Sequence, residues 1–272
     1  MKQLIDYINE SILNDINDTM NDSISDELII NWIKENWLVT GELNVKFDGK
    51  KYVVDCNGNL QPRTGKITNG LFVWGNVMGN FIFNRLDTDI QKVKSLKDVG
   101  LPQFVGGILN LHCFNNVTNL EGLPGNVGSL YITGFKKMTS LKGCPTNVKN
   151  DFTILLCPAL KGLDYLPNHI GGGITINHNR NLLSIDGLSA VTNVVNGNLF
   201  LNGNFSLKSL HGCPSIVDGN FSCEKCKSLT SLSGCPEQVK YSFSCKTCAT
   251  RFKKHEVESI CQVGGEIGAY VR

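Results

Sequence analysis

The chain has 272 residues, of which 41% are hydrophobic, and this is enough apolar material for a substantial core in one or two domains. Only 18% of the residues are charged and the net charge is +2, so no global electrostatic field points to a nucleic acid or an acidic surface. These values argue against a nucleic-acid-binding protein and leave a protein partner as the expectation.

The first segment, MKQLIDYINESILND, is interrupted by acidic residues, and no stretch of the chain approaches the length of a membrane span. We therefore expect neither a signal peptide nor contact with a membrane. Eleven cysteines in a chain of this size and without an export signal then favour free thiols in a reducing, cytoplasmic compartment.

Residues 1–65 predict a small α+β cap. Apolar residues recur on one side of a helix within residues 1–20. Ser25 can cap a second helix, with Asp26 and Glu27 in its first turn, where carboxylates suit the positive end of the helix. Further along, Asp48-Gly49 lies between two alternating apolar runs and predicts a β-hairpin.

From residue 66 to residue 250 the sequence repeats with a period of about 22. Residues 207–226 read LKSLHGCPSIVDGNFSCEKC, and residues 229–248 read LTSLSGCPEQVKYSFSCKTC. The same register extends toward the N-terminus on the turn prolines Pro102, Pro124, Pro145, Pro167, Pro214 and Pro236. A further unit lacks the proline but keeps Ile185 and Val195, with three extra residues in its loop, and an incomplete first unit keeps Val77 and Phe81. We count about eight rungs, where a rung is one turn of the repeat.

Each unit alternates apolar and polar residues with period two over its strand, as in Phe-x-Cys or Ile-x-Ile, and Leu-x-x-Leu then returns to the core from the opposite side. A single unit cannot bury this ring of apolar residues, so neighbouring units must stack into a parallel sheet around one core. We expect Phe152, Phe221 and Phe243 to lie in that shared core.

The spacing of LFLNGNFSLKSL at residues 199–210 is close to the leucine-rich-repeat pattern L-x-L-x-x-N-x-L-x-x-L, with one residue added. In this pattern the ladder position, whose side chain satisfies backbone groups of the turn, falls on Cys157, Asn179, Asn204, Cys226 and Cys248.

The chain resembles leucine-rich-repeat-like proteins of tailed bacteriophages and their gut relatives, which look like runs of LTSLxGCPxxVxGxFxC. The likeness covers nearly the whole chain and includes the YINESIL segment at residues 7–13. It implies an α+β N-terminal cap (1–65), a leucine-rich-repeat-like solenoid of about eight rungs with a parallel β-sheet (66–250), and a C-terminal cap (251–272). That last cap would contain a helix over residues 253–261 and a strand over residues 267–271. The resemblance implies little about activity.

Two C-x-x-C pairs, Cys223 with Cys226 and Cys245 with Cys248, have a zinc-ribbon spacing. The repeat explains the same spacing without metal, because each pair occupies one core position and one ladder position, where small thiols pack well. We prefer the packing interpretation, with no cofactor, and a zinc-stabilised binding module stays open as an alternative.

The strand face that points away from the core is the surface that solenoids usually offer to a partner. Counting six, eight and ten residues from each turn proline predicts this face, and the same count places Tyr131 and Thr133 in the core. The candidate binding residues from this count, with Phe200 from the unit without a proline, are Ile108, Asn110, His112, Leu130, Ile132, Leu155 and Phe200. Either a partner covers the apolar residues among them or the N-terminal region folds over them.

The sequence contains no G-x-S-x-G, Walker or dinucleotide-binding fingerprint, and its histidines fall in no recurrent catalytic spacing. We therefore expect a non-enzymatic, protein-binding repeat scaffold. Through the resemblance, this would be a bacteriophage accessory protein that binds a viral or host protein in the host cytoplasm or the virion. The alternative is a structural component of the phage head or tail, held within a larger assembly.

Overall fold

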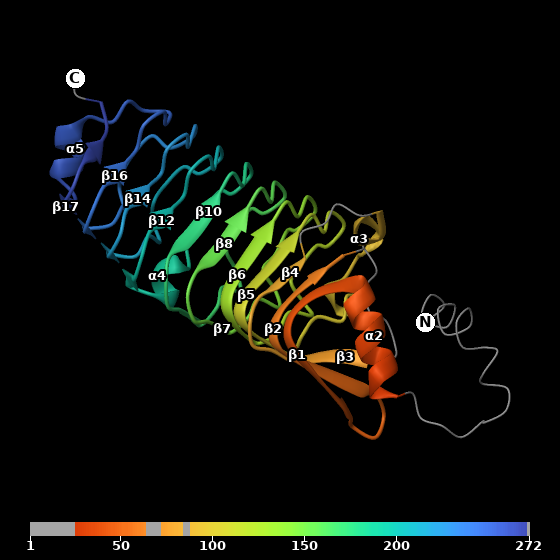
Figure 1. Cartoon of the computed structure of the whole chain (residues 1–272). Coiled ribbons are helices and arrows are strands. Elements are labelled where there is room, and N and C mark those ends of the chain that lie inside the picture. Colours follow the sequence, from red (N-terminus) through yellow and green to blue (C-terminus); the bar gives the residue numbers. More distant parts are fainter. Residues whose placement is uncertain (1–24, 64–71, 84–87, 271–272) are drawn as a thin grey trace, which may run out of the picture.

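The computed structural model describes residues 25–63, 72–83 and 88–270. These residues form a parallel β-solenoid of about nine turns, with few and short helices (Figure 1). The predicted repeat solenoid is thereby confirmed. The helix expected within residues 1–20, the boundary expected at residues 65 and 66, and the last residue of the expected C-terminal strand lie outside the described residues.

A sheet of fourteen strands runs along the solenoid in the order β1-β2-β3-β5-β6-β8-β10-β12-β14-β16-β18, with β4, β7 and β9 beside this path. Its strands are β1 (Trp37–Phe47), β2 (Tyr52–Pro62), β3 (Phe72–Val77), β4 (Phe81–Phe83), β5 (Phe104–His112), β6 (Asn126–Thr133), β7 (Asn147–Val148), β8 (Phe152–Leu155), β9 (His169–Ile170), β10 (Ile174–Asn177), β12 (Leu199–Phe200), β14 (Phe221–Ser222), β16 (Phe243–Ser244) and β18 (Ile267–Gly268). A second sheet consists of β11 (Val194–Val195), β13 (Ile216–Val217), β15 (Gln238–Val239) and β17 (Gln262–Val263).

The first described element is helix α2 (Asp26–Asn36), which packs at the N-terminal end of the solenoid (Figure 1). The Ser25 hydroxyl accepts a hydrogen bond from the Leu28 amide at 3.3 Å, as expected for an N-cap. Ile29 and Ile33 are buried, and the ring of Trp32 packs edge-on against Phe72 with centroids 5.9 Å apart. Burial of this one apolar face fixes the helix against the first strands.

The hairpin predicted at Asp48-Gly49 is present, with strands of eleven residues on each side. Asp48 Oδ1 accepts hydrogen bonds from the amides of Lys51 and Lys50, both at 2.9 Å, and these bonds lower the pKa of the Asp48 carboxyl. Strand β2 then pairs in parallel with β3 and β4. The hairpin therefore belongs to the same continuous sheet as the repeats.

The core is a single stack of side chains that recur once per rung. Phe152, Phe221 and Phe243 are at most 1% exposed and belong to one cluster of buried residues, and the rings of Phe221 and Phe243 lie 4.7 Å apart. Parallel pairing puts Phe221 beside Leu199 on one side and Phe243 on the other. The prediction of one continuous core is thus confirmed.

The rungs approach one another closely where the chain turns into the main sheet. At Gly219 an added Cβ would lie 2.3 Å from the Gly197 carbonyl oxygen, so a side chain there would push adjacent rungs apart. The unit with three extra residues contains the short helix α4 (Leu188–Val191). The main sheet continues past it through the pairing of β10 with β12, but β9 does not pair with β11, which begins the second sheet. Between the hairpin and α4, the described residues also include α3 (Thr88–Lys92) and the 3₁₀ turn η2 (Leu96–Asp98).

At the C-terminal end, helix α5 (Lys254–Glu258) is shorter than the helix expected over residues 253–261. The Lys253 amide donates to Glu256 Oε2 at 2.7 Å, which satisfies one of the free donors at the helix start. Strands β17 and β18 then add one more rung to the two sheets.

Candidate functional site

The outer face of the main sheet, meaning the side chains of its strands that point away from the core, consists of rows that run along the solenoid. Strand pairing fixes the central row, because each of its residues is the register partner of the next. Adjacent strands in such a sheet lie about 4.8 Å apart. From β5 to β16 the central row is Asn110, Tyr131, Thr153, Thr175, Phe200, Ser222 and Ser244.

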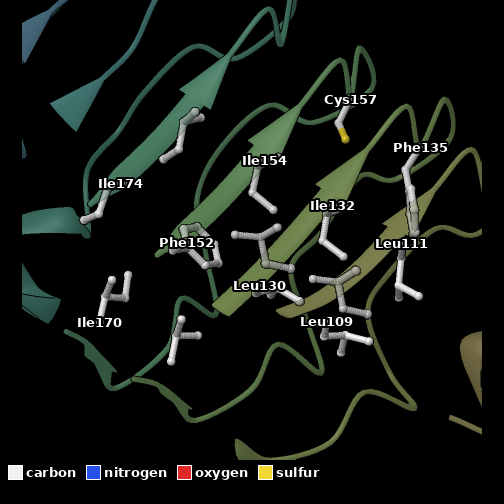
Figure 2. Close-up of a cluster of buried hydrophobic side chains, with 14 of the residues drawn as sticks. Leu109, Leu111, Leu130, Ile132, Phe135, Phe152, Ile154, Cys157, Ile170 and Ile174 are labelled. Carbon is white, nitrogen blue, oxygen red and sulfur yellow. The ribbon is translucent and has the colours of Figure 1, made fainter. Parts of the chain in front are cut away.

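Two of the predicted face residues were wrong. Leu130 and Ile132 have no exposed surface and point into the core beside Leu109 and Leu111 (Figure 2). Tyr131 takes the outward position instead.

A difference in loop length explains this error. Val127 and Leu130 are three residues apart, whereas the corresponding core residues of the preceding rung, Val105 and Leu109, are four apart. The pairing of β5 with β6 shifts register between Val105 and Ile108 to absorb the extra residue. Because side chains alternate along a strand, a shift of one residue exchanges the two faces.

The other predicted face residues lie on the outer face and are partly buried: Ile108, Asn110, His112, Leu155 and Phe200. Ile108 on β5 pairs with Ser129 in one outer row. Leu155 on β8 pairs with Thr133 in a different row, two strands further along the sheet. With Leu130 and Ile132 in the core, the apolar patch expected on the N-terminal half is not formed. The large side chains on the central row are Tyr131 and Phe200.

Many polar side chains on this face are occupied by the backbone of the next rung. Asn198 Oδ1 accepts the Asn220 amide at 2.8 Å, and Asn220 Oδ1 accepts the Ser242 amide at 3.1 Å. A parallel series runs from Asn177 through Asn202, whose Oδ1 accepts the Glu224 amide at 2.8 Å. These asparagine side chains stabilise the stack of rungs, so they are less free to bind a partner than the sequence suggests.

A hollow of about 200 Å³ lies on the outer face between Tyr131 and Phe200. Its floor includes the two central threonines, Thr153 and Thr175, and its lining includes Asp151. Burial, and to a smaller extent the negative charge of Asp151, raises the pKa of the Tyr131 hydroxyl. The hollow is framed by Tyr131, which the sequence count missed, and the shorter Val127–Leu130 spacing was the signal that could have revealed it.

The paired cysteines fill the core and ladder positions that the repeat predicted. Cys226 Sγ contacts the Leu201 carbonyl at 3.2 Å and Cys248 Sγ contacts the Cys223 carbonyl at 3.1 Å, so both thiols donate to the preceding rung. A hydrogen bond to Cys248, together with burial, raises the pKa of Cys223. Among the residues that the structure describes, no group of three or more His, Cys, Asp or Glu side chains is placed to hold a metal ion.

Asn179 and Asn204 occupy the same ladder position with amide side chains. Asn204 Oδ1 accepts the Asn179 amide at 3.0 Å, and Asn179 Oδ1 accepts the Cys157 amide at 2.9 Å. Both asparagines are fully buried. Their side chains therefore satisfy turn groups that would otherwise be buried without partners.

A second hollow, of about 620 Å³, lies beside α5 and is lined mainly by serine, threonine and apolar residues. Its acidic residues are Glu237 and Glu256, and Glu256 already accepts the Lys253 amide. None of the predicted face residues lines this second hollow.

Within the described part of the chain, no helix has the length and apolar character needed to cross a bilayer. Comparison with models of known protein families, with curated proteins and with solved structures gives no match to this chain.

Proposed function

We propose that the chain is a non-enzymatic repeat scaffold that binds a protein partner through the outer face of its main sheet. The observation that carries the proposal is the hollow between Tyr131 and Phe200. Solenoids bind partners over the extended surface that their stacked strands create. Protein interfaces concentrate binding energy in a few aromatic or arginine anchors surrounded by weaker contacts.

The neighbouring side chains support this location. Beyond Phe200 the central row continues as Ser222 and Ser244, which are small and allow a partner backbone to approach the sheet. On the other side of the hollow, Asn110 and Ile108 give a mixed polar and apolar rim. An aromatic centre with a small, polar surround has the composition of a protein interface.

The partner is a viral or host protein, and the chain acts in the host cytoplasm or the virion. This part of the proposal rests on the resemblance of the LTSLxGCPxxVxGxFxC repeats to those of tailed-bacteriophage proteins. It is consistent with a small net charge, which gives no general attraction for nucleic acid.

Affinity capture from cells that express the chain tests the proposal. Immobilised wild-type protein and Phe200→Ala are compared, with Tyr241→Ala as the matched control. Tyr241 is 53% exposed and does not line the hollow. The expected result is a protein retained by the wild type and by Tyr241→Ala and lost from Phe200→Ala. Equal retention by all three would contradict the assigned face, and circular dichroism of each variant checks that its fold is intact.

A further inference from the structure

The hollow between Tyr131 and Phe200 has an aromatic residue at each end and small residues between them. Its aromatic walls stand on β6 and β12, three strand steps apart, which is about 14 Å at about 4.8 Å per step. Between them the central row holds Thr153 and Thr175, and Gly173 also lines the hollow. A Cβ at Gly173 would come within 3.3 Å of Asp151 Oδ1, so the glycine keeps the space beside this carboxylate open.

The carboxylate of Asp151 is the charged group of this hollow. Its Oδ1 accepts the Gly173 amide at 2.8 Å, which fixes its orientation. None of the ion pairs found among the described residues involves Asp151. Its negative charge therefore faces the hollow without a cation from those parts of the chain.

We propose that the hollow receives one cationic side chain, an arginine or a lysine, from the protein partner. The inference rests on the proposed function and specifies the chemistry of its central contact. A guanidinium or ammonium group can lie over an aromatic face and pair with a carboxylate at the same time. The volume of about 200 Å³ is below the range of about 300–1,000 Å³ typical of small-molecule sites and suits a single side chain.

Charge selects this occupant over the alternatives. An apolar side chain would remove Asp151 from water without giving it a partner, which is unfavourable. An acidic side chain would be repelled by the same carboxylate. A cation is favoured by Asp151 and can at the same time lie over one of the two rings, Tyr131 or Phe200.

The test uses Nα-acetyl-arginine methylamide as the probe in an NMR titration of the full chain labelled with ¹⁵N. The expected result is saturable shifts of the backbone amides of Gly173, Gly197 and Asn198, which line the hollow. The norleucine and glutamate analogues are expected to bind at least about fivefold more weakly, because they lack the cation.

A matched pair of variants assigns the effect to Asp151. Asp151→Asn keeps the oxygen that accepts the Gly173 amide but removes the charge, and it is expected to lower the affinity for the arginine probe about fivefold or more. Asp186→Asn removes an exposed carboxylate elsewhere and is expected to leave the affinity unchanged.

The inference is overturned if the wild type shows no saturable shifts, if the norleucine probe binds as well as arginine, or if Asp151→Asn binds arginine normally. Tighter binding of a methyl glycoside than of arginine would also overturn it, in favour of a carbohydrate ligand. If partner capture depends on Phe200 but the arginine probe does not bind, the proposed function stands and only the proposed cationic contact is refuted.

Discussion

Tyr131 and Ile132 are neighbours in the chain with opposite environments. Ile132 has no exposed surface, whereas Tyr131 frames a hollow on the outer face. The repeat count from the turn proline reverses this assignment because one residue is missing between Val127 and Leu130. Side-chain alternation is readable from sequence, but its phase depends on the length of each loop.

The phase of β6 can be tested with one substitution on each face. Ile132→Asp places a charge in the core and is expected to lower the free energy of unfolding by at least about 4 kcal/mol. Tyr131→Ser, on the outer face, is expected to cost about 1 kcal/mol or less. Urea unfolding followed by circular dichroism measures both, and the reverse order of the two effects would contradict the assigned register.

Phe221 tests the shared core. Phe221→Ala leaves a cavity beside Leu199 and Phe243 and is expected to cost about 3–5 kcal/mol in urea unfolding. Tyr241→Ala removes an aromatic side chain that is 53% exposed and serves as the control, with an expected change within about 0.5 kcal/mol. Similar small effects for both would be incompatible with a continuous core.

Buried thiols are expected to lower the free energy of unfolding as the pH becomes alkaline. Burial raises the pKa of Cys157 and of Cys226 to about 12, above the ordinary thiol value of 9.0. The unfolded chain therefore loses these protons first, so stability is complete below pH 9 and falls as the pH rises toward 12. We expect the urea midpoint to drop between pH 8 and pH 10.5.

The double variant Cys157→Ala with Cys226→Ala isolates this effect from other groups that titrate at high pH. Its urea midpoint is expected to fall less over the same pH interval than that of the wild type. An equal fall in both proteins would show that these thiols do not contribute to the pH dependence.

At the scale of elements, local signals in the sequence predicted much of the N-terminal region. Ser25 caps α2, and Asp48 orders the hairpin loop through the amides of Lys50 and Lys51. Both features depend on contacts within a few residues, which is why sequence reveals them. The pairing of β2 with β3 and β4 depends on distant segments and could not be read in the same way.

The ladder of turns is the element-scale feature with the clearest energetic consequence. Asn204 accepts the Asn179 amide and donates to the Ile176 carbonyl at 2.6 Å and the Leu201 carbonyl at 2.8 Å. Asn204→Leu would leave these buried groups unpaired and is expected to cost about 3 kcal/mol or more. Urea unfolding provides the measurement.

Two controls sharpen this prediction. Asn204→Cys retains a donor, as Cys226 does toward Leu201, and is expected to be more stable than Asn204→Leu. Asn181→Leu removes an exposed side chain whose Nδ2 donates to the Pro158 carbonyl, and about 1 kcal/mol is expected there. If Asn204→Leu were as mild as Asn181→Leu, the ladder would not support the turns.

At the scale of the whole molecule, the period of 22 residues predicted the solenoid, the parallel sheet and the shared core, because repeated spacing is a global property of the sequence. The surface was harder to predict. The sequence predicts Phe200 as a face residue, but the hollow is also lined by Tyr131. The outward position of Tyr131 follows from the register shift in one irregular rung. The C-x-x-C pairs lie at equivalent positions of adjacent rungs, where Cys226 and Cys248 contact carbonyls of the preceding rung.

The most direct test of the proposed binding face is site-specific photocross-linking. Phe200 is replaced by the photoreactive aromatic benzoylphenylalanine in the full chain, and Tyr241 is replaced in the same way as the control. After irradiation in the cells that naturally contain the chain, mass spectrometry identifies the cross-linked peptides. We predict one protein partner joined at position 200 and absent at position 241; partner peptides joined at position 241 but not at position 200 would contradict binding through the outer face.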